Sequence, residues 1–302
     1  MFFSVVIPLY NKAYSIQRCI DSVLNQSYTN FEIIVVNDGS IDKSLELIER
    51  YKKHDERIVL ISRENRGLIA SLNEGIALAK GEYIARMDAD DISILNRFEL
   101  QYNFMLKNDL DICGGDFISI DELGNYVKIN SVPKTKDEIL ITMANNAPFA
   151  HPTVMIKSEF LKKTNLVYGV YGNKAAEDVD LWINMYNNGA NFGNLNEIVL
   201  KYRILSSSYS HKNAKILKKE VNMQFDAFVL KHRQAFSNSI ENIFNSDIVL
   251  SYTQEKNLMK CVLRYSHVNI EFKYIFNIFK KIKLKSFLIG LLAYMTFFVY
   301  MK

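Results

Sequence analysis

The stretch EYIARMDADD, residues 82–91, carries an apolar run straight into three aspartates within four positions. A strand that buries Ile84 and Met87 and then exposes paired acids is unusual if the acids serve only for solvation. Carboxylates at this spacing can share one hard cation, such as Mg²⁺ or Mn²⁺, which removes their mutual repulsion. We therefore predict a strand that ends in a cation-binding loop containing Asp88 and Asp90. For Asp91 a second interpretation stays open, in which it caps the next helix.

Around this stretch, the first 120 residues alternate between short apolar runs and segments with helical periodicity. Strands are predicted over residues 4–10, 31–38, 57–62, 82–88 and 110–120. Helices are predicted between them, over residues 16–24, 42–54, 67–81 and 96–108. Nearly continuous apolar strands that alternate with helices indicate an α/β fold whose mostly parallel sheet is flanked by helices on both faces.

The pattern loosens after residue 120. An antiparallel strand is expected over 124–129, a strand followed by a helix over 153–163, a helix over 177–189 and a strand over 197–204. From about residue 212 the sequence is mostly helical. We therefore predict one domain over residues 1–210 and a helical C-terminal region over 211–302.

Composition excludes several classes of protein. An apolar fraction of 49% with 23% charged residues fits a globular protein with a full core. The net charge of +4 is too small to indicate nucleic acid, and we expect no nucleic-acid partner. The three cysteines, Cys19, Cys113 and Cys261, lie far apart, which favours reduced thiols in a cytoplasmic protein.

The two ends of the chain differ in character. The N-terminal apolar run is short and interrupted by Pro8 and Asn11, so no signal peptide is expected. Residues 287–301 form an uncharged run that is shorter than the ~20 residues needed to span a bilayer. Five lysines in residues 273–285 precede it. We expect the tail over 273–302 to lie on an anionic membrane surface; a buried C-terminal helix is the alternative.

Polar side chains follow the ends of the predicted strands, where ligands bind in an open parallel sheet. Tyr10 could stack on a base, Asp38 could accept a hydrogen bond from a base N–H, and Arg66 could meet phosphate. Neither a GxGxxG nor a GxxxxGK[ST] motif is present, so a bound phosphate must be handled by side chains and metal. The set suits a nucleotide with phosphates.

Five blocks in this order resemble family 2 glycosyltransferases, which have a GT-A fold with a Rossmann-like sheet. The blocks are VVIPLYN, VVNDGS, ENRGLIASLN, ARMDADD and AAEDVDLW, and the resemblance covers roughly residues 3–205. It implies an inverting enzyme that forms a β-linkage from an α-linked UDP-sugar with the help of Mn²⁺ or Mg²⁺.

The resemblance also implies roles for individual residues. The uracil would contact three of them, Pro8, Tyr10 and Asp38. Arg66 would lie near the nucleotide, and Asp88 and Asp90 would form the DXD pair, with Asp88 reaching the ribose and metal and Asp90 holding the metal. Asp178 would be the catalytic base, although acidic residues at 177–178 also suit the first turn of a helix.

Three further residues have weaker signals. His151 could line the acceptor side, Trp182 could stack on a sugar, and His211 could approach the metal; a structural role stays open for each. Two positions depart from the family pattern, with Asn184 and Leu205 where relatives often carry arginine and histidine. No motif of processive synthases is present, which favours addition of one sugar at a time.

The predicted function is transfer of one sugar from a UDP-sugar to a glycan or lipid-linked acceptor of the cell surface, at the cytoplasmic face of the plasma membrane. Two alternatives stay open. A sugar-phosphate nucleotidyltransferase shares the alternating sheet but normally has a glycine-rich N-terminal loop, which residues 8–15 lack. A non-catalytic carbohydrate-binding relative is disfavoured by the intact Asp88, Asp90 and Asp178.

Overall fold

The computed structural model describes residues 2–169, 176–205, 214–246 and 250–269. Its chain forms two compact units. The first contains residues up to 132 together with the described residues from 149 to 205. The second contains residues 133–148 and the described residues from 214 onward.

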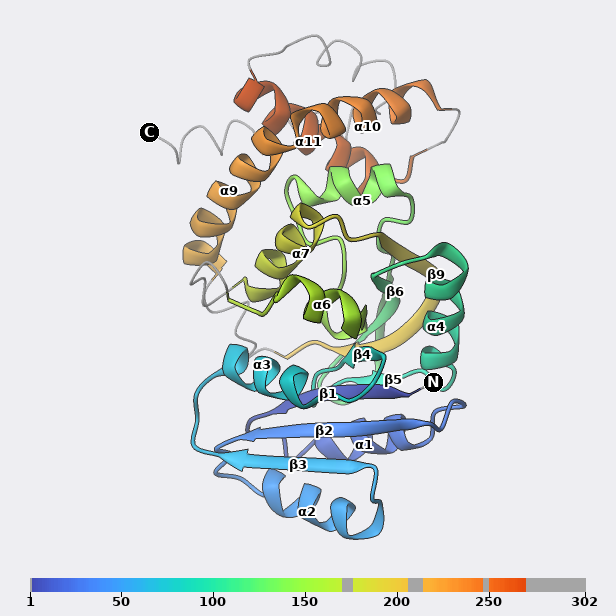
Figure 1. Cartoon of the computed structure of the whole chain (residues 1–302), viewed down its shortest axis with the longest axis vertical. Coiled ribbons are helices and arrows are strands. Elements are labelled where there is room, and N and C mark those ends of the chain that lie inside the picture. Colours follow the sequence, from blue (N-terminus) through green and yellow to red (C-terminus); the bar gives the residue numbers. More distant parts are fainter. Residues whose placement is uncertain (1, 170–175, 206–213, 247–249, 270–302) are drawn as a thin grey trace. The chain divides into compact units, whose positions relative to one another are not determined.

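One curled sheet organises the first unit (Figure 1). Among the described residues its strands are β1 (Phe3–Leu9), β2 (Phe31–Asp38), β3 (Ile58–Arg63), β4 (Tyr83–Arg86), β5 (Ile92–Ser93), β6 (Ile112–Ile120), β7 (Tyr126–Asn130), β8 (Met155–Lys157) and β9 (Phe192–Arg203). The strand order is β3-β2-β1-β4-β8-β6-β9-β5. Strand β7 lies off this path and pairs antiparallel with the C-terminal half of β6, on the edge opposite to β9. The predicted α/β class is confirmed.

The sheet is parallel in its first half and mixed in its second. Strands β1 to β4 are mutually parallel, with Phe3 opposite both Phe31 and Tyr83. Strand β8 then enters antiparallel between β4 and β6, while β6 and β9 run parallel to each other. The two-residue strand β5 is too short to leave a periodic signal, so the sequence did not predict it.

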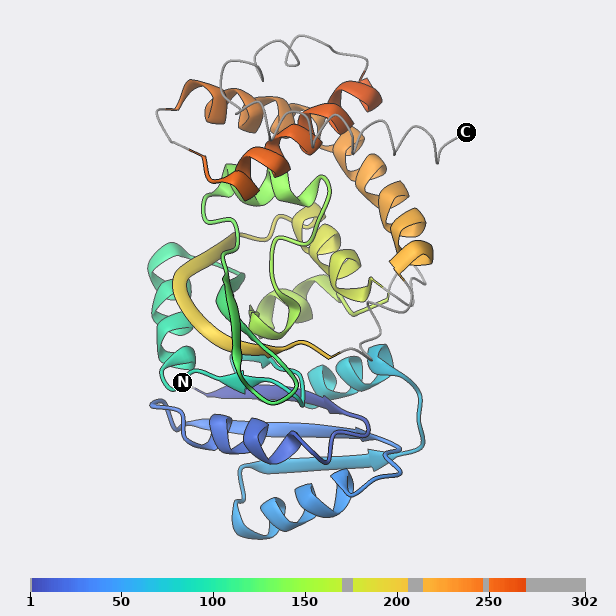
Figure 2. The ribbon, with the colours of Figure 1, turned by 180° about the vertical axis from the view of Figure 1, so that it is seen from behind.

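Helices cover the sheet of the first unit. They are α1 (Ile16–Leu24), α2 (Ser44–His54), α3 (Leu68–Leu78), α4 (Arg97–Asn108), α6 (Ser158–Thr164) and α7 (Glu177–Asn187). Figure 2 shows α1 lying across one face of β2. Helix α3 packs so closely that a Cβ on Gly75 would lie 2.5 Å from a methyl carbon of Val6. Glycine at this position is therefore required by close helix–strand packing.

The hydrophobic core lies where these helices meet the sheet. Its aromatic centre is Phe3, whose ring contacts those of Tyr28, Tyr83, Phe98 and Tyr102 at centroid separations of 4.8–6.2 Å. Each such ring removes a large apolar area from water. Strand β4, which precedes the acidic loop (residues 88–91), is therefore anchored in this aromatic group through Tyr83.

The described part of the second unit is helical. Its helices are α5 (Lys136–Met143), α9 (Ala214–Lys231), α10 (Arg233–Asn245) and α11 (Tyr252–Asn269). Helix α5 begins with a capping box formed by Thr135 and Glu138. The Asp137 carboxylate accepts a hydrogen bond of 2.6 Å from the Ser239 hydroxyl.

The helical character of the C-terminal region is confirmed for its described residues. Residues 133–148, which the sequence assigned to the first domain, pack with these later helices. Within the described ranges, no helix combines the length and the apolar character needed to cross a membrane. The tail over 273–302 lies outside the described residues.

Candidate active site

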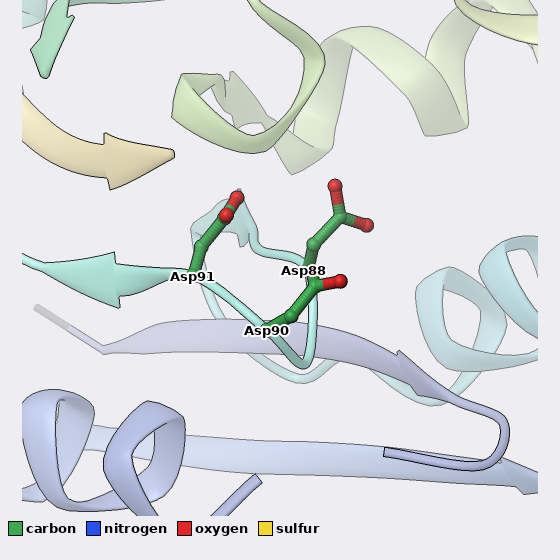
Figure 3. Close-up of side chains that lie close together, drawn as sticks. All are labelled: Asp88, Asp90 and Asp91. Carbon is green, nitrogen blue, oxygen red and sulfur yellow. The ribbon is translucent and has the colours of Figure 1, made fainter. Parts of the chain in front are cut away.

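The acidic loop follows β4 and brings three carboxylates together (Figure 3). One oxygen from each of Asp88, Asp90 and Asp91 lies within 4.8 Å of the others. The loop turns tightly, because the Asp91 N–H donates to the Asp88 carbonyl at 3.3 Å. Such a spacing allows all three groups to reach one hard cation.

The Asp88 carboxylate is held by Arg86, which lies two residues earlier on β4. Arg86 donates to both carboxylate oxygens, at 2.8 Å and 2.7 Å. The Arg86 side chain is only 5% exposed, whereas that of Asp88 is 30% exposed, so a buried guanidinium holds a carboxylate that solvent can still reach. The orientation of Asp88 is therefore fixed before any ligand binds.

Asp91 does not cap the next helix, because Asn96 precedes α4. Its side chain is 1% exposed, and its Oδ1 accepts a hydrogen bond of 2.8 Å from the Arg203 N–H. Its Oδ2 is buried without a hydrogen-bond partner among the described residues. Burial, and then the neighbouring Asp88, raise the pKa of this carboxyl well above its usual value. A buried oxygen that lacks a donor suits a cation ligand.

Asp90 completes the set. The Lys12 ammonium lies 2.6 Å from its Oδ2. Burial and the charge of Asp88 raise the Asp90 pKa, and Lys12 opposes them. Three mutually repelling carboxylates with an orphaned buried oxygen fit a divalent cation, which Asp90 and Asp91 would hold beside Asp88.

The nucleotide side of the predicted site lies at the ends of β1 and β2. Pro8 is a partly buried member of β1, and Tyr10 is 47% exposed just after that strand. Asp38 is 4% exposed at the end of β2, and it accepts hydrogen bonds from the backbone N–H groups of Arg66 (2.8 Å) and Gly67 (2.9 Å). Asp38 therefore holds the backbone of the loop after β3 in place from its position at the end of β2.

Arg63 is a functional candidate that sequence reasoning missed. Its guanidinium pairs with Asp38 and with Glu74, the latter at 2.6 Å, and its side chain is 10% exposed. The Arg66 side chain, in contrast, is 59% exposed and lies 3.7 Å from Glu64. The buried cation beside Asp38 is thus Arg63. No local motif marks it, because the pairing joins two neighbouring strands.

The predicted base lies in the first turn of α7. The Asp178 carboxylate accepts a hydrogen bond of 2.8 Å from the Val179 N–H. Burial raises its pKa, Arg86 lowers it, and Asp88 raises it further. The charges of β4 and its loop therefore act on Asp178, so the structure brings the acidic loop and the start of α7 within electrostatic reach of each other.

Both ring nitrogens of His151 lie close to polar side chains of the protein. Its Nε2 lies 2.8 Å from the Tyr168 hydroxyl, and its Nδ1 lies 3.6 Å from the Glu177 carboxylate. Burial lowers its pKa well below the usual value, so the ring is neutral at physiological pH. These contacts link Tyr168 to α7 through His151. They favour a structural role for His151 over direct contact with an acceptor.

Trp182 is fully buried. Its ring packs edge-on against Phe149 and His151, with centroids 5.4 Å and 5.9 Å away. This burial favours the core role that the sequence left open over a sugar-stacking floor.

The two positions that depart from the family pattern have contacts of their own. Asn184 donates to the Asp180 carbonyl at 2.9 Å, one turn earlier in α7, and Leu205 is 9% exposed. His211 lies outside the described residues.

Glu177 gives the site a pH dependence. Burial, and then the charge of Asp178, raise its pKa from 4.5 to about 7. Between these values the folded chain holds a proton that the unfolded chain has released, so stability falls as pH rises through 7. Glu177→Gln should remove this loss, and its stability relative to wild type should rise by about 2–3 kcal/mol between pH 5 and pH 8. Urea unfolding of both proteins at the two pH values measures the difference; parallel pH dependences would contradict the assignment.

The family of the chain follows from comparison with known proteins. Residues 4–164, more than half of the chain, match the family model described as Glycosyl transferase family 2. The matched segment includes the acidic loop, Asp38 and His151. The chain belongs to glycosyltransferase family 2.

Named relatives agree with this assignment. The chain is 35% identical over 208 residues to the O-antigen biosynthesis glycosyltransferase WbnJ of Escherichia coli, covering 68% of this chain and 80% of that one. It is 33% identical over 215 residues to the putative glycosyltransferase EpsE of Bacillus subtilis, covering 70% and 76%. The chain is therefore a glycosyltransferase.

A solved structure supports the fold. The S. aureus TarS fragment 1–349 in complex with UDP-GlcNAc matches with a TM-score of 0.61 and 20% identity, covering 97% of this chain and 80% of that one. At this level of identity the match concerns the fold alone. The GT-A type of sheet expected from the sequence is confirmed.

Proposed function

We propose that this enzyme moves one sugar from a UDP-sugar to a glycan or lipid-linked acceptor during cell-surface polysaccharide synthesis, with inversion at the anomeric carbon. The observation that carries the proposal is the closeness of the start of α7 to β4. Glu177, the neighbour of Asp178, lies 3.6 Å from His151, and the segment after His151 is tied to β4 by a hydrogen bond of 3.0 Å from the Arg86 N–H to the Val154 carbonyl. The charges of Arg86 and Asp88 accordingly act on the pKa of Asp178. An inverting transfer needs a base and a leaving-group site that come from different segments and serve one substrate.

The proposed base is Asp178. A sugar hydroxyl becomes an adequate nucleophile when a carboxylate begins to take its proton. Burial raises the pKa of Asp178, which makes its carboxylate a stronger proton acceptor. Glu177, with a pKa of about 7, is partly protonated at neutral pH, which limits the repulsion between the two neighbouring groups.

The proposed donor site lies at the strand ends. Tyr10 offers an exposed ring for a base, and Asp38, with Arg63 and Arg66 beside it, faces the nucleotide. Asp88 would reach the ribose, while Asp90 and Asp91 would hold a divalent cation. When bound, that cation would offset the negative charge of the leaving diphosphate. TarS, which shares the fold, has been crystallised with UDP and with UDP-GlcNAc.

We place the enzyme at the cytoplasmic face of the plasma membrane, with its acceptor. The similarity to WbnJ, an O-antigen biosynthesis glycosyltransferase, supports a surface-glycan acceptor. The lysine-rich and apolar sequence of residues 273–302 supports attachment to an anionic membrane surface. Deleting these residues should move the protein from the membrane to the soluble fraction of lysed cells. An unchanged distribution would contradict this role.

Release of UDP tests the proposed reaction. The purified protein is incubated with a panel of UDP-sugars, with Mn²⁺, with Mg²⁺ and with EDTA. We expect UDP from at least one donor, and less of it in EDTA. A nucleotidyltransferase would instead release pyrophosphate from UTP and a sugar phosphate, and a non-catalytic relative would bind without turnover. Either result would contradict the proposal.

A further inference from the structure

Lys12 lies at the acidic loop without belonging to it. It follows β1 and precedes α1, where its backbone is fixed on both sides. Its N–H donates to the Ser44 hydroxyl at 2.8 Å, and its carbonyl accepts from the Ile16 N–H at 2.9 Å. The backbone therefore gives the side chain a firm origin beside the acidic cluster.

The Lys12 ammonium is directed at one carboxylate of that cluster. Its Nζ lies 2.6 Å from Asp90 Oδ2, and the two side chains are 27% and 13% exposed. Asp90 is one of the two residues assigned above to the divalent cation. The ammonium and that cation would therefore use the same carboxylate.

The two basic side chains that contact the aspartates, Arg86 and Lys12, differ in their freedom to move. Arg86 is 5% exposed and grips Asp88 with two nitrogens. Lys12 makes a single contact to a carboxylate, is more exposed, and carries a compact charge on a flexible four-carbon stem. Of the two cations, Lys12 is therefore the one that can exchange partners without breaking a bidentate pair.

The partner expected for the released ammonium is the diphosphate of a bound nucleotide. Lys12 follows Tyr10 and Asn11, and the turn they form is tied to the turn after β2 by Asn11, whose Oδ1 accepts from the Ile41 N–H at 2.9 Å. A nucleotide held by Tyr10 and Asp38 would extend its phosphates toward the acidic loop. An ammonium on this turn is positioned to meet those phosphates.

We propose that Lys12 competes with a divalent cation for the Asp90 carboxylate, and that its ammonium binds the diphosphate of the donor when the cation takes Asp90. The proposal rests on the function proposed above. It makes Lys12 a diphosphate-binding residue and gives it opposite effects on the two ligands. Its removal favours the cation and disfavours the nucleotide.

The test compares Lys12→Met with the wild type. Free Mn²⁺ is measured by electron paramagnetic resonance without nucleotide, and UDP and uridine binding are measured by calorimetry at saturating Mn²⁺. Since a neighbouring charge shifts carboxylate equilibria by one to three powers of ten, we expect Mn²⁺ to bind about tenfold more tightly and UDP about tenfold more weakly. Uridine affinity should stay unchanged, because uridine has no phosphate.

Two controls accompany this variant. Lys52→Met removes the same charge from the exposed side of α2 and should change neither affinity. Lys12→Arg keeps the charge and should stay closer to the wild type for Mn²⁺ than Lys12→Met does. If Lys12→Met does not fold, as judged by its circular dichroism, Lys12→Gln replaces it.

The outcomes separate the two proposals. Unchanged Mn²⁺ affinity or unchanged UDP affinity in Lys12→Met, with a wild type that binds both, overturns the role of Lys12 and leaves the proposed function standing. A wild-type protein that binds neither Mn²⁺ nor UDP overturns the proposed function as well.

Discussion

Asp178→Asn should lower the rate of UDP-sugar-dependent transfer by a factor of between about 10² and 10⁴, because general-base catalysis contributes this much. The amide keeps the size of the side chain and can still accept from the Val179 N–H, so α7 should be unaffected. UDP affinity should stay within about twofold of wild type, since Asp178 is not proposed to touch the nucleotide. Initial rates of acceptor-dependent UDP release and calorimetry with UDP measure the two quantities.

Glu177→Gln is the matched control for this variant. It changes a neighbouring carboxylate in the same helical turn and leaves the proposed base intact. Its transfer rate should fall far less than that of Asp178→Asn, and the pH dependence of the rate should shift because a nearby titrating group is lost. Equal losses in the two variants, or an unchanged rate in Asp178→Asn, would remove Asp178 from the mechanism.

Asp90→Asn should weaken Mn²⁺ binding and reduce transfer by roughly 10³-fold, equivalent to about 4 kcal/mol of transition-state stabilisation. The cause is the loss of an anionic ligand from a cluster that depends on charge. Raising the Mn²⁺ concentration should recover part of the rate, because the remaining Asp91 oxygen is still present. Rates measured across a Mn²⁺ titration give both the loss and the recovery.

Glu197→Gln provides the charge-matched control, since Glu197 is an exposed carboxylate on β9. Its Mn²⁺ dependence should match that of the wild type. If Asp90→Asn also retained the wild-type Mn²⁺ dependence, the acidic loop would not be the metal site.

Local patterns account for what the sequence could predict. Runs such as residues 31–38 have every residue buried, and continuous burial is the signature of a parallel central strand. The aspartates after β4 were recognisable because charge directly follows such a run. The nucleotide-facing positions then followed from the rule that strand ends meet at one edge.

Tertiary contacts account for what the sequence could not predict. The hydrogen bond that holds Oδ1 of Asp91 comes from the Arg203 N–H, 112 residues away in the chain, and Oδ2 is left without a partner among the described residues. The contacts of His151 with Tyr168 and Glu177 likewise join separate segments. The sequence predicted no helix over residues 133–148, where α5 lies, and only its packing against later helices, which includes the hydrogen bond between Asp137 and Ser239, places it in the second unit. No local period carries this information.

The proposed metal site is tested most directly by anomalous diffraction at the manganese edge, recorded from crystals of the protein grown with Mn²⁺ and UDP. We expect one anomalous peak within coordination distance of Asp90 and Asp91, about 2.0–2.3 Å, with the diphosphate of UDP bound to the same ion. A peak elsewhere, or UDP bound away from the acidic loop, would contradict it.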